Sequence, residues 1–252
     1  MDLEASDWKD TDSSDMSGIS FTLISVIKEY ESLGHNIENR PNLEIYPSSL
    51  KGIDYPEYFK VEQNASAIIS LAASGSYWSQ FAYQFAHEYC HYLIGSPMFT
   101  KQGGTEESSF WFEESICKLA SCFFLEKISL SWKLSTQERF QTFAESHHMY
   151  YENHIAKIAT IDIPLSQWIH ENIESLKEKG VDDNRESYSV IAKCLLPLFL
   201  EHPNLWRILP YLKRVDQNTY KDFPHWIKQV VKPEIPDDLS KDFELLENKL
   251  IG

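Results

Sequence analysis

The sequence lacks an excess of basic residues. Among its 252 residues, 38 are acidic and 23 are lysine or arginine, which leaves a formal net charge of −15. Proteins that bind nucleic acid usually carry a basic patch or stripe, and this sequence has no such pattern. We therefore expect no nucleic-acid partner, and we interpret the acidic excess mainly as a source of solubility.

Long apolar runs and paired cysteines are also missing. No stretch reaches the ~18 apolar residues that a membrane-spanning helix requires. The segment Met1–Gly18 carries six acidic residues and one lysine, whereas a secretory signal has a basic start and an apolar run. The four cysteines, none in a CxxC pair, are typical of free thiols in a reducing compartment. We predict a cytoplasmic protein without a membrane span, in which residues 1–18 form a disordered acidic leader.

Apolar periodicity predicts an α+β fold. Runs rich in β-branched or aromatic residues predict a small sheet, with strands at Leu43–Tyr46, Tyr58–Glu62 and Ala67–Ala72. Helical spacing predicts helices at Ser20–Leu33, Tyr77–Ile94, Phe110–Ile128, Thr136–Ile158, Ser166–Glu178, Glu186–Glu201, Leu205–Val215, Tyr220–Val231 and Leu239–Leu250. We therefore predict one domain over residues 19–252. A small mixed lobe (19–95) would pack on a mostly helical lobe (96–252), with a cleft between them.

One motif carries chemistry: the run His87-Glu88-Tyr89-Cys90-His91 fits the pattern HExxH within a predicted helix. His87 and His91 lie one turn apart on the same helix face, so both imidazoles can bind one zinc ion. Glu88 can reach a water on the metal and act as its general base. The helix around the motif is strongly apolar. Burying these three side chains there without partners would be costly, which favours a metal role.

A catalytic zinc needs a third protein ligand and an open position. Further along the chain, Glu113 and Glu114 stand near a predicted helix start, where acidic residues also interact favourably with the helix dipole. With HExxH upstream, the run Trp111-Phe112-Glu113-Glu114 resembles the gluzincin zinc metallopeptidases, whose second helix bears a zinc-binding glutamate in the pattern Trp-Leu/Phe-x-Glu. The resemblance implies a zincin-like fold with the metal in its cleft. It also implies Glu114 as the third ligand, with Glu113 as the alternative.

The resemblance further implies a group that stabilises the oxyanion. Aminopeptidase-like gluzincins carry a catalytic tyrosine downstream, at the opening of a helix, and the segment Glu186–Lys193 is similar to that region. This assigns the role to Tyr188, whose phenol would donate a hydrogen bond to the developing oxyanion. Thermolysin-type enzymes use a histidine instead, and the alternative here is the cluster His147, His148 and His154.

Two departures narrow the resemblance. No Gly-x-Met-Glu-Asn segment precedes HExxH, which argues against a standard aminopeptidase. Lys118 stands where thermolysin-type enzymes have an aspartate that orients the first histidine, so another group must orient His87. We therefore predict a zinc endopeptidase that acts on peptides or proteins. Its strand Ala67–Ala72 would offer an edge to an extended substrate.

Two other classes of function remain open. One is a metallopeptidase-like regulatory or binding protein that keeps its zinc but turns over little substrate. The other is a helical interaction protein in which the HExxH pattern is accidental. Bound zinc without peptide hydrolysis would favour the first class, and absence of bound metal at neutral pH would favour the second.

Overall fold

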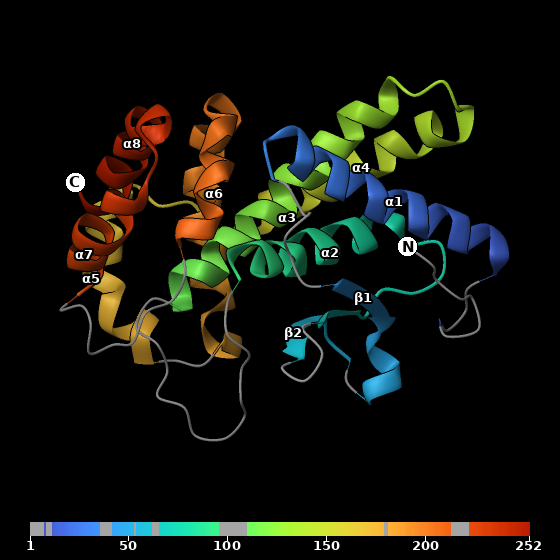
Figure 1. The fold of residues 1–252 in the computed structure, drawn as a ribbon, viewed down its shortest axis with the longest axis horizontal. Helices are drawn as coiled ribbons and strands as arrows, with labels where there is room; N and C mark the ends of the chain where they lie inside the picture. The colour runs from blue at the N-terminus through green and yellow to red at the C-terminus, as the bar shows by residue number, and fades with distance from the viewer. Residues whose placement is uncertain are drawn as a thin grey trace. The chain divides into compact units, whose positions relative to one another are not determined.

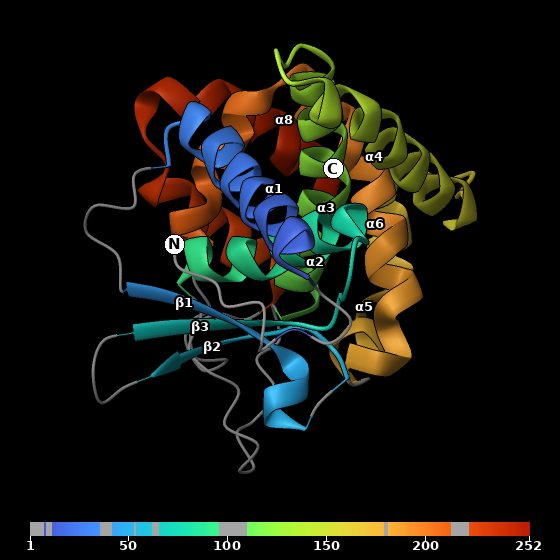
Figure 2. The ribbon, with the colours of Figure 1, turned by 90° about the vertical axis from the view of Figure 1, so that its right-hand side faces the viewer.

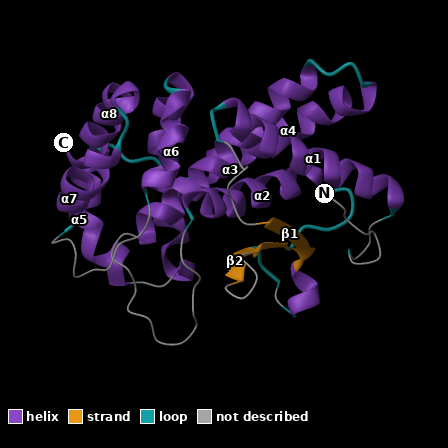
Figure 3. Ribbon diagram, in the orientation of Figure 1, coloured by secondary structure: helices purple, strands orange, loops and turns teal. Residues whose placement is uncertain are grey.

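The computed structural model describes residues 8, 12–35, 42–52, 54–61, 66–95, 110–178, 181–212 and 222–252. These residues form a small sheet and a larger set of helices, so the α+β class is confirmed (Figures 1 and 3). The chain divides into two compact units: Met1–Tyr92 with Ala120–Ile155, and Leu93–Leu119 with Ala156–Gly252. Helices α2 (Trp78–Ile94) and α3 (Phe110–Lys133) each run from one unit into the other.

Helix α1 (Ser13–Ser32) begins inside the segment that was predicted to be a disordered leader. A capping box explains the early start. The Asp12 carboxylate accepts a hydrogen bond from the Asp15 backbone N–H at 2.8 Å, and the Asp15 carboxylate accepts one from the Asp12 N–H at 3.5 Å. Residues 13–18 are therefore helix and not leader. Among residues 1–11 the structure describes only Trp8, which is buried against Phe81.

All three predicted strands are confirmed, as β1 (Asn42–Pro47), β2 (Glu57–Val61) and β3 (Ser66–Leu71). Their order in the sheet is β1-β3-β2, and Figure 2 shows β3 in the middle. β3 pairs in parallel with β1 and antiparallel with β2. The prediction that this strand offers an edge to a substrate is therefore wrong, because both of its sides are already paired. The edges of this sheet belong to β1 and β2.

The end of the central strand is tied directly to α2. The side-chain oxygen of Gln84 accepts hydrogen bonds from the backbone N–H groups of Ala72 and Ala73, at 2.9 and 3.0 Å. Gln84 lies one turn before Glu88 on the same helix, and it is buried. The sheet is thus anchored to the helix that carries HExxH within one turn of the motif.

The first unit has one core that four helices share. Tyr30 of α1 stacks on Phe124 of α3, with ring centroids 3.6 Å apart, and its hydroxyl donates to the Ala86 carbonyl on α2 at 3.0 Å. Ser129 of α3 donates to the Ala144 carbonyl on α4 (Glu138–Lys157) at 2.8 Å. These contacts explain why residues 120–155 belong with the sheet. The predicted lobe boundary at residue 95 does not coincide with this division.

The second unit contains the start of α3 and the C-terminal helices. These are α5 (Leu165–Glu178), α6 (Val181–Glu201), the 3₁₀ segment η3 (Pro203–Tyr211), α7 (Phe223–Trp226), the π-helical segment η5 (Ile227–Val231), the 3₁₀ turns η6 (Lys232–Glu234) and η7 (Asp237–Leu239), and α8 (Ser240–Ile251). An aromatic cluster of Trp111, Phe112, Phe223 and Trp226 lies in its core. None of the helices in the described ranges is long and apolar enough to cross a membrane.

Two predicted helices of this unit have a different form in the structure. Over Leu205–Val215 the chain is a 3₁₀ helix that ends at Tyr211, with one proline at its start and another, Pro210, inside it. Residues 213–215 lie outside the described residues. Over Tyr220–Val231, regular α-helix begins only at Phe223. There the Asp222 side chain caps it by accepting from the His225 N–H at 2.8 Å.

The first turn of α2 packs directly against the backbone of α1. Trp78 is 1% exposed, and a Cβ atom placed on Gly18 would lie 1.9 Å from a carbon of its indole ring. On α4, the Phe143 ring lies 4.0 Å from the Trp78 ring between centroids, and the Arg139 guanidinium lies 4.6 Å from it. Three helices therefore meet at one indole, and only glycine fits at position 18 without movement.

We predict that Gly18→Ala destabilises the protein. At an open helix position alanine stabilises by about 1 kcal/mol relative to glycine. Here the methyl group overlaps the Trp78 ring, and overpacking of a core costs about 1–3 kcal/mol. Urea denaturation followed by circular dichroism should therefore give a lower midpoint for the variant. Ser20→Ala on the same helix should change stability by less than about 0.5 kcal/mol. A Gly18→Ala protein more stable than the wild type would contradict this packing.

Candidate metal centre

The HExxH residues lie on α2 as the sequence predicts. His87 and His91 lie one turn apart, with ring centroids 5.0 Å apart and ring planes inclined by 71°. His91 is buried, His87 is partly exposed, and Glu88 between them is 4% exposed. Both imidazoles therefore belong to one helix face, and the carboxylate that follows the first of them is nearly removed from bulk water.

The start of α3 fixes Glu114. Trp111 and Phe112 enter the aromatic core of the second unit through contacts with Phe223, at centroid distances of 4.6 and 5.3 Å. In the next turn the Ser115 hydroxyl donates to the Trp111 carbonyl at 2.7 Å. The run of aromatic residues that resembles the gluzincin pattern thus anchors the first turn of the helix. Glu114, which is 7% exposed, lies on the same helix within one turn of Trp111 and is held in place by these contacts.

His87, His91 and Glu114 form a group that can hold a metal ion. Each side chain offers one ligand atom, and these atoms all lie within 4.8 Å of one another. Ligand atoms around one tetrahedral zinc lie about 3.4 Å apart, so the group needs to contract by little more than about 1 Å. Glu113 is buried at 2% exposure but is not part of the group. The carboxylate that meets the two imidazoles is therefore that of Glu114.

The donor set fits a divalent transition metal. Two imidazole nitrogens and one carboxylate oxygen suit zinc, and imidazole also suits copper, iron and nickel. Three protein ligands leave one tetrahedral position open, which is the arrangement of catalytic rather than structural zinc sites. The residues present are thus compatible with a catalytic zinc ion.

Tyr188 lies inside α6 and not at its opening as predicted. The helix already begins at Val181, two turns earlier, because the residues that follow Gly180 contain no helix-breaking residue. Tyr188 is 1% exposed and is one of the largest fully buried side chains of the second unit. Its role toward an oxyanion stays a prediction.

The three histidines of the alternative cluster have separate partners. His147 is fully buried, and its Nδ1 lies 2.9 Å from the Ser79 hydroxyl. Burial lowers the pKa of His147 from 6.5 to about 4, so this imidazole is neutral at physiological pH. Since it is enclosed, His147 is a packing residue of α4 in the first unit.

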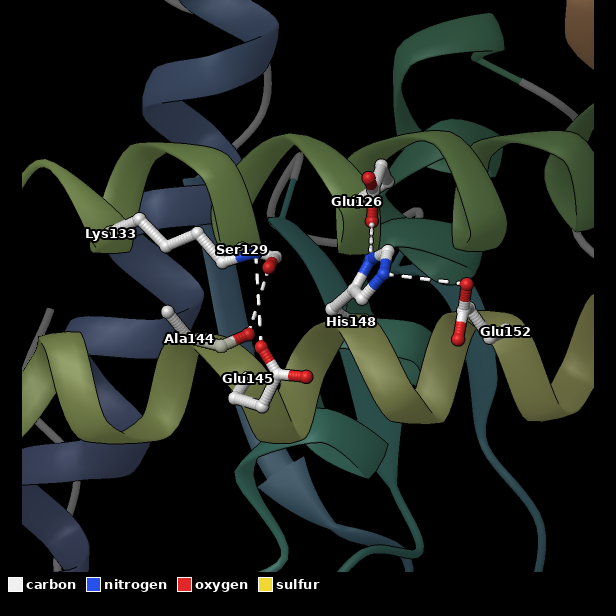
Figure 4. A network of polar contacts seen from close by, with 7 residues as sticks. All are labelled: Glu126, Ser129, Lys133, Ala144, Glu145, His148 and Glu152. Atoms are coloured by element: carbon white, nitrogen blue, oxygen red, sulfur yellow. Dashed lines mark hydrogen bonds and ion pairs between the residues drawn. The ribbon is translucent and has the colours of Figure 1, made fainter.

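The other two histidines differ from His147 and from each other. His148 lies between Glu126, at 2.8 Å, and Glu152, at 3.4 Å, as Figure 4 shows. The hydrogen bond with Glu126 is the main cause that raises the pKa of His148. His154 instead stacks on Tyr83 of α2, with ring centroids 4.5 Å apart. The three imidazoles therefore do not act as one group.

Comparisons of this chain with models of protein families, with curated proteins and with solved structures give no match. The case for a metal centre therefore rests on the HExxH helix and on the closeness of its two imidazoles to the Glu114 carboxylate.

We predict that Glu114→Ala weakens zinc binding and that Glu113→Ala does not. Removing Glu114 takes away one of three ligands, whereas Glu113 is equally acidic and buried but outside the group. Zinc content after dialysis, measured by atomic emission, should be close to one ion per chain in the wild type and in Glu113→Ala. Glu114→Ala and His91→Ala should lose the ion. The opposite result for the two glutamates would make Glu113 the ligand.

Proposed function

We propose that this protein is a zinc-dependent peptidase of the gluzincin type, acting as an endopeptidase on peptides or proteins. The observation that carries the proposal is the group of His87, His91 and Glu114, with ligand atoms within 4.8 Å of one another, next to the buried Glu88. The HExxH order makes Glu88 a neighbour of the first ligand and leaves it out of the ligand set. A purely structural metal site would have no use for this fourth side chain.

A zinc ion bound there would supply Lewis acidity, which brings the pKa of a coordinated water to about 7. With the metal bound, Glu88 would take a proton from the water whose oxygen bonds to the carbonyl carbon of the scissile peptide. The Glu88 carboxylate would pass that proton to the amide nitrogen, so that the C–N bond breaks and the amine leaves. Each proton that Glu88 accepts is therefore returned within the same turnover.

Substrate must be held as well as cleaved. An extended peptide can add to a sheet edge through main-chain hydrogen bonds, so this mode of binding recognises the substrate backbone rather than its side chains. Because β3 is paired on both sides, only β1 and β2 remain available for this in the described sheet. The missing Gly-x-Met-Glu-Asn segment supports internal cleavage, since aminopeptidase-like gluzincins use that segment to hold a free amine.

We predict that Glu88→Gln keeps the metal and loses nearly all hydrolysis. The amide has the same shape as the carboxylate but cannot take a proton from water. Zinc content should match the wild type, and the cleavage rate on a mixed peptide pool, followed by mass spectrometry, should fall by at least about 10². Wild-type protein that binds zinc and cleaves no peptide would instead favour a regulatory or binding role. A Glu88→Gln variant that cleaves normally would exclude Glu88 as the base.

We predict that Tyr188→Phe lowers kcat and leaves zinc content unchanged. If the phenol donates to the oxyanion, losing that donor costs about 10²–10³ in kcat with little effect on KM. Tyr211→Phe, the same change on the partly exposed 3₁₀ segment, serves as the control. Activity of Tyr188→Phe within a fewfold of wild type would make Tyr188 a packing residue only.

A further inference from the structure

Gln84 is a buried polar side chain of α2 that the proposed mechanism does not use. It is 8% exposed, and its Oε1 accepts hydrogen bonds from the backbone N–H groups of Ala72 and Ala73 at 2.9 and 3.0 Å. Strand β3 ends at Leu71, so these two N–H groups lie beyond the sheet. All of these residues belong to the first unit. Gln84 therefore satisfies two backbone donors that lie outside the sheet ladder.

The two hydrogen bonds determine the orientation of the Gln84 amide. A backbone N–H can only donate, so the atom that faces Ala72 and Ala73 must be the side-chain oxygen. The –NH2 group on the same carbon therefore points in a different direction. Among the described residues no hydrogen bond uses Nε2, and Nε2 is not one of their enclosed, unpartnered polar atoms. Two N–H donors of fixed direction are thus open to a ligand at this position.

Gln84 shares the face of α2 that carries the HExxH side chains. His87, Glu88 and His91 follow it by three, four and seven residues on the same helix. With 3.6 residues per turn, these spacings place all three within about 60° of Gln84 around the helix axis. Gln84 stands about one turn before His87 and Glu88. Its open donors therefore lie beside the place where a scissile peptide would meet the Glu88 carboxylate.

We propose that Gln84 is a substrate-binding residue: its –NH2 group donates to a main-chain carbonyl oxygen of the bound peptide, while Ala72 and Ala73 hold its oxygen. The inference rests on the proposed function, because it requires a peptide beside Glu88. Every peptide carries main-chain carbonyl oxygens whatever its side chains are, so this contact suits a site that recognises the backbone. The contact is the same before and during bond cleavage, and it therefore acts on KM rather than on kcat.

The bonds to the two alanines prepare Gln84 for this role. A free glutamine side chain loses much rotamer freedom when it binds a ligand. Here the oxygen is already fixed by two backbone N–H groups, so the amide needs little further ordering when a peptide binds. Glu88 accepts hydrogen bonds when it is ionised and cannot supply a donor. Gln84 therefore complements Glu88 on the same helix face.

The main test is Gln84→Glu in the full-length, zinc-loaded protein. The carboxylate keeps an oxygen for the two backbone N–H groups, and its second oxygen replaces the –NH2 group and has no proton to donate. We expect KM for a peptide that the wild type cleaves to rise about 10-fold, with kcat within about twofold and zinc content unchanged. Both constants are compared at the plateau of the pH profile, where a new charge near Glu88 no longer alters its protonation.

Two further variants separate substrate binding from packing. Gln84→Met removes the acceptor as well as the donors, so it should raise KM by about as much and also lower the Tm. Gln80→Glu places the same charge one turn earlier on α2 and should leave KM within about twofold of wild type. A Gln84→Glu protein with wild-type KM and Tm would make Gln84 only a link between sheet and helix, which overturns the inference.

An equal rise of KM in Gln80→Glu also overturns the inference, because the effect would then come from charge alone. If Gln84→Glu does not fold, as judged by circular dichroism, the KM of Gln84→Met decides. A rise of about 10-fold then supports the inference, and a wild-type value overturns it.

A binding measurement without cleavage separates this inference from the proposed function. In zinc-loaded protein that carries Glu88→Gln, fluorescence anisotropy of dye-labelled casein gives a Kd, and adding Gln84→Glu should raise that Kd about 10-fold. If the wild type cleaves no peptide but this Kd responds as expected, only the peptidase activity is overturned. If the wild type cleaves peptides while KM and Kd ignore Gln84→Glu, only the role of Gln84 is overturned. A chain that binds neither zinc nor casein overturns both.

Discussion

The burial of acidic and imidazole side chains in an apolar helix environment is the constraint on which the rest of this structure depends. Glu88, His91 and Glu114 are each less than 8% exposed. A carboxylate removed from water is costly unless it is paired, hydrogen-bonded or bound to a cation. The structure brings the ligand atoms of His87, His91 and Glu114 within 4.8 Å of one another, which is the arrangement that one divalent ion can compensate.

Such a group requires a helix that cannot shift. Three contacts along α2 hold it in place. The Gln84 side chain accepts hydrogen bonds from the two backbone amides after β3, and the Ala86 carbonyl accepts one from the Tyr30 hydroxyl. The Trp78 ring packs on the α1 backbone at Gly18. The first two contacts lie within one turn of His87 and the third lies more than two turns before it. The contacts that rigidify α2 are therefore concentrated around the residues that would bind metal, as preorganised sites require.

The spacing of apolar residues predicted most helices and strands, and missed features that depend on specific hydrogen bonds or on pairing between distant segments. The strands, most helices and the HExxH helix follow from residue periodicity, and Glu114 follows from a short motif. The start of α1 was missed because it depends on a reciprocal bond between Asp12 and Asp15 rather than on apolar spacing. The central place of β3 and the hydrogen bond from Tyr30 to the Ala86 carbonyl involve partners far away in sequence, which no periodicity encodes.

Charge balance gives a reason for the difference between the two neighbouring glutamates. One divalent ion with the carboxylates of Glu114 and Glu88 and two neutral imidazoles is electrically neutral. If Glu113 also faced the ion, its carboxylate would add a third negative charge. The carboxylates of Glu114 and Glu88 already balance the two positive charges of the ion. Glu113 lies outside the ligand group despite its 2% exposure, so under the proposed function the centre would hold one cation with Glu114 as ligand and Glu88 as proton acceptor.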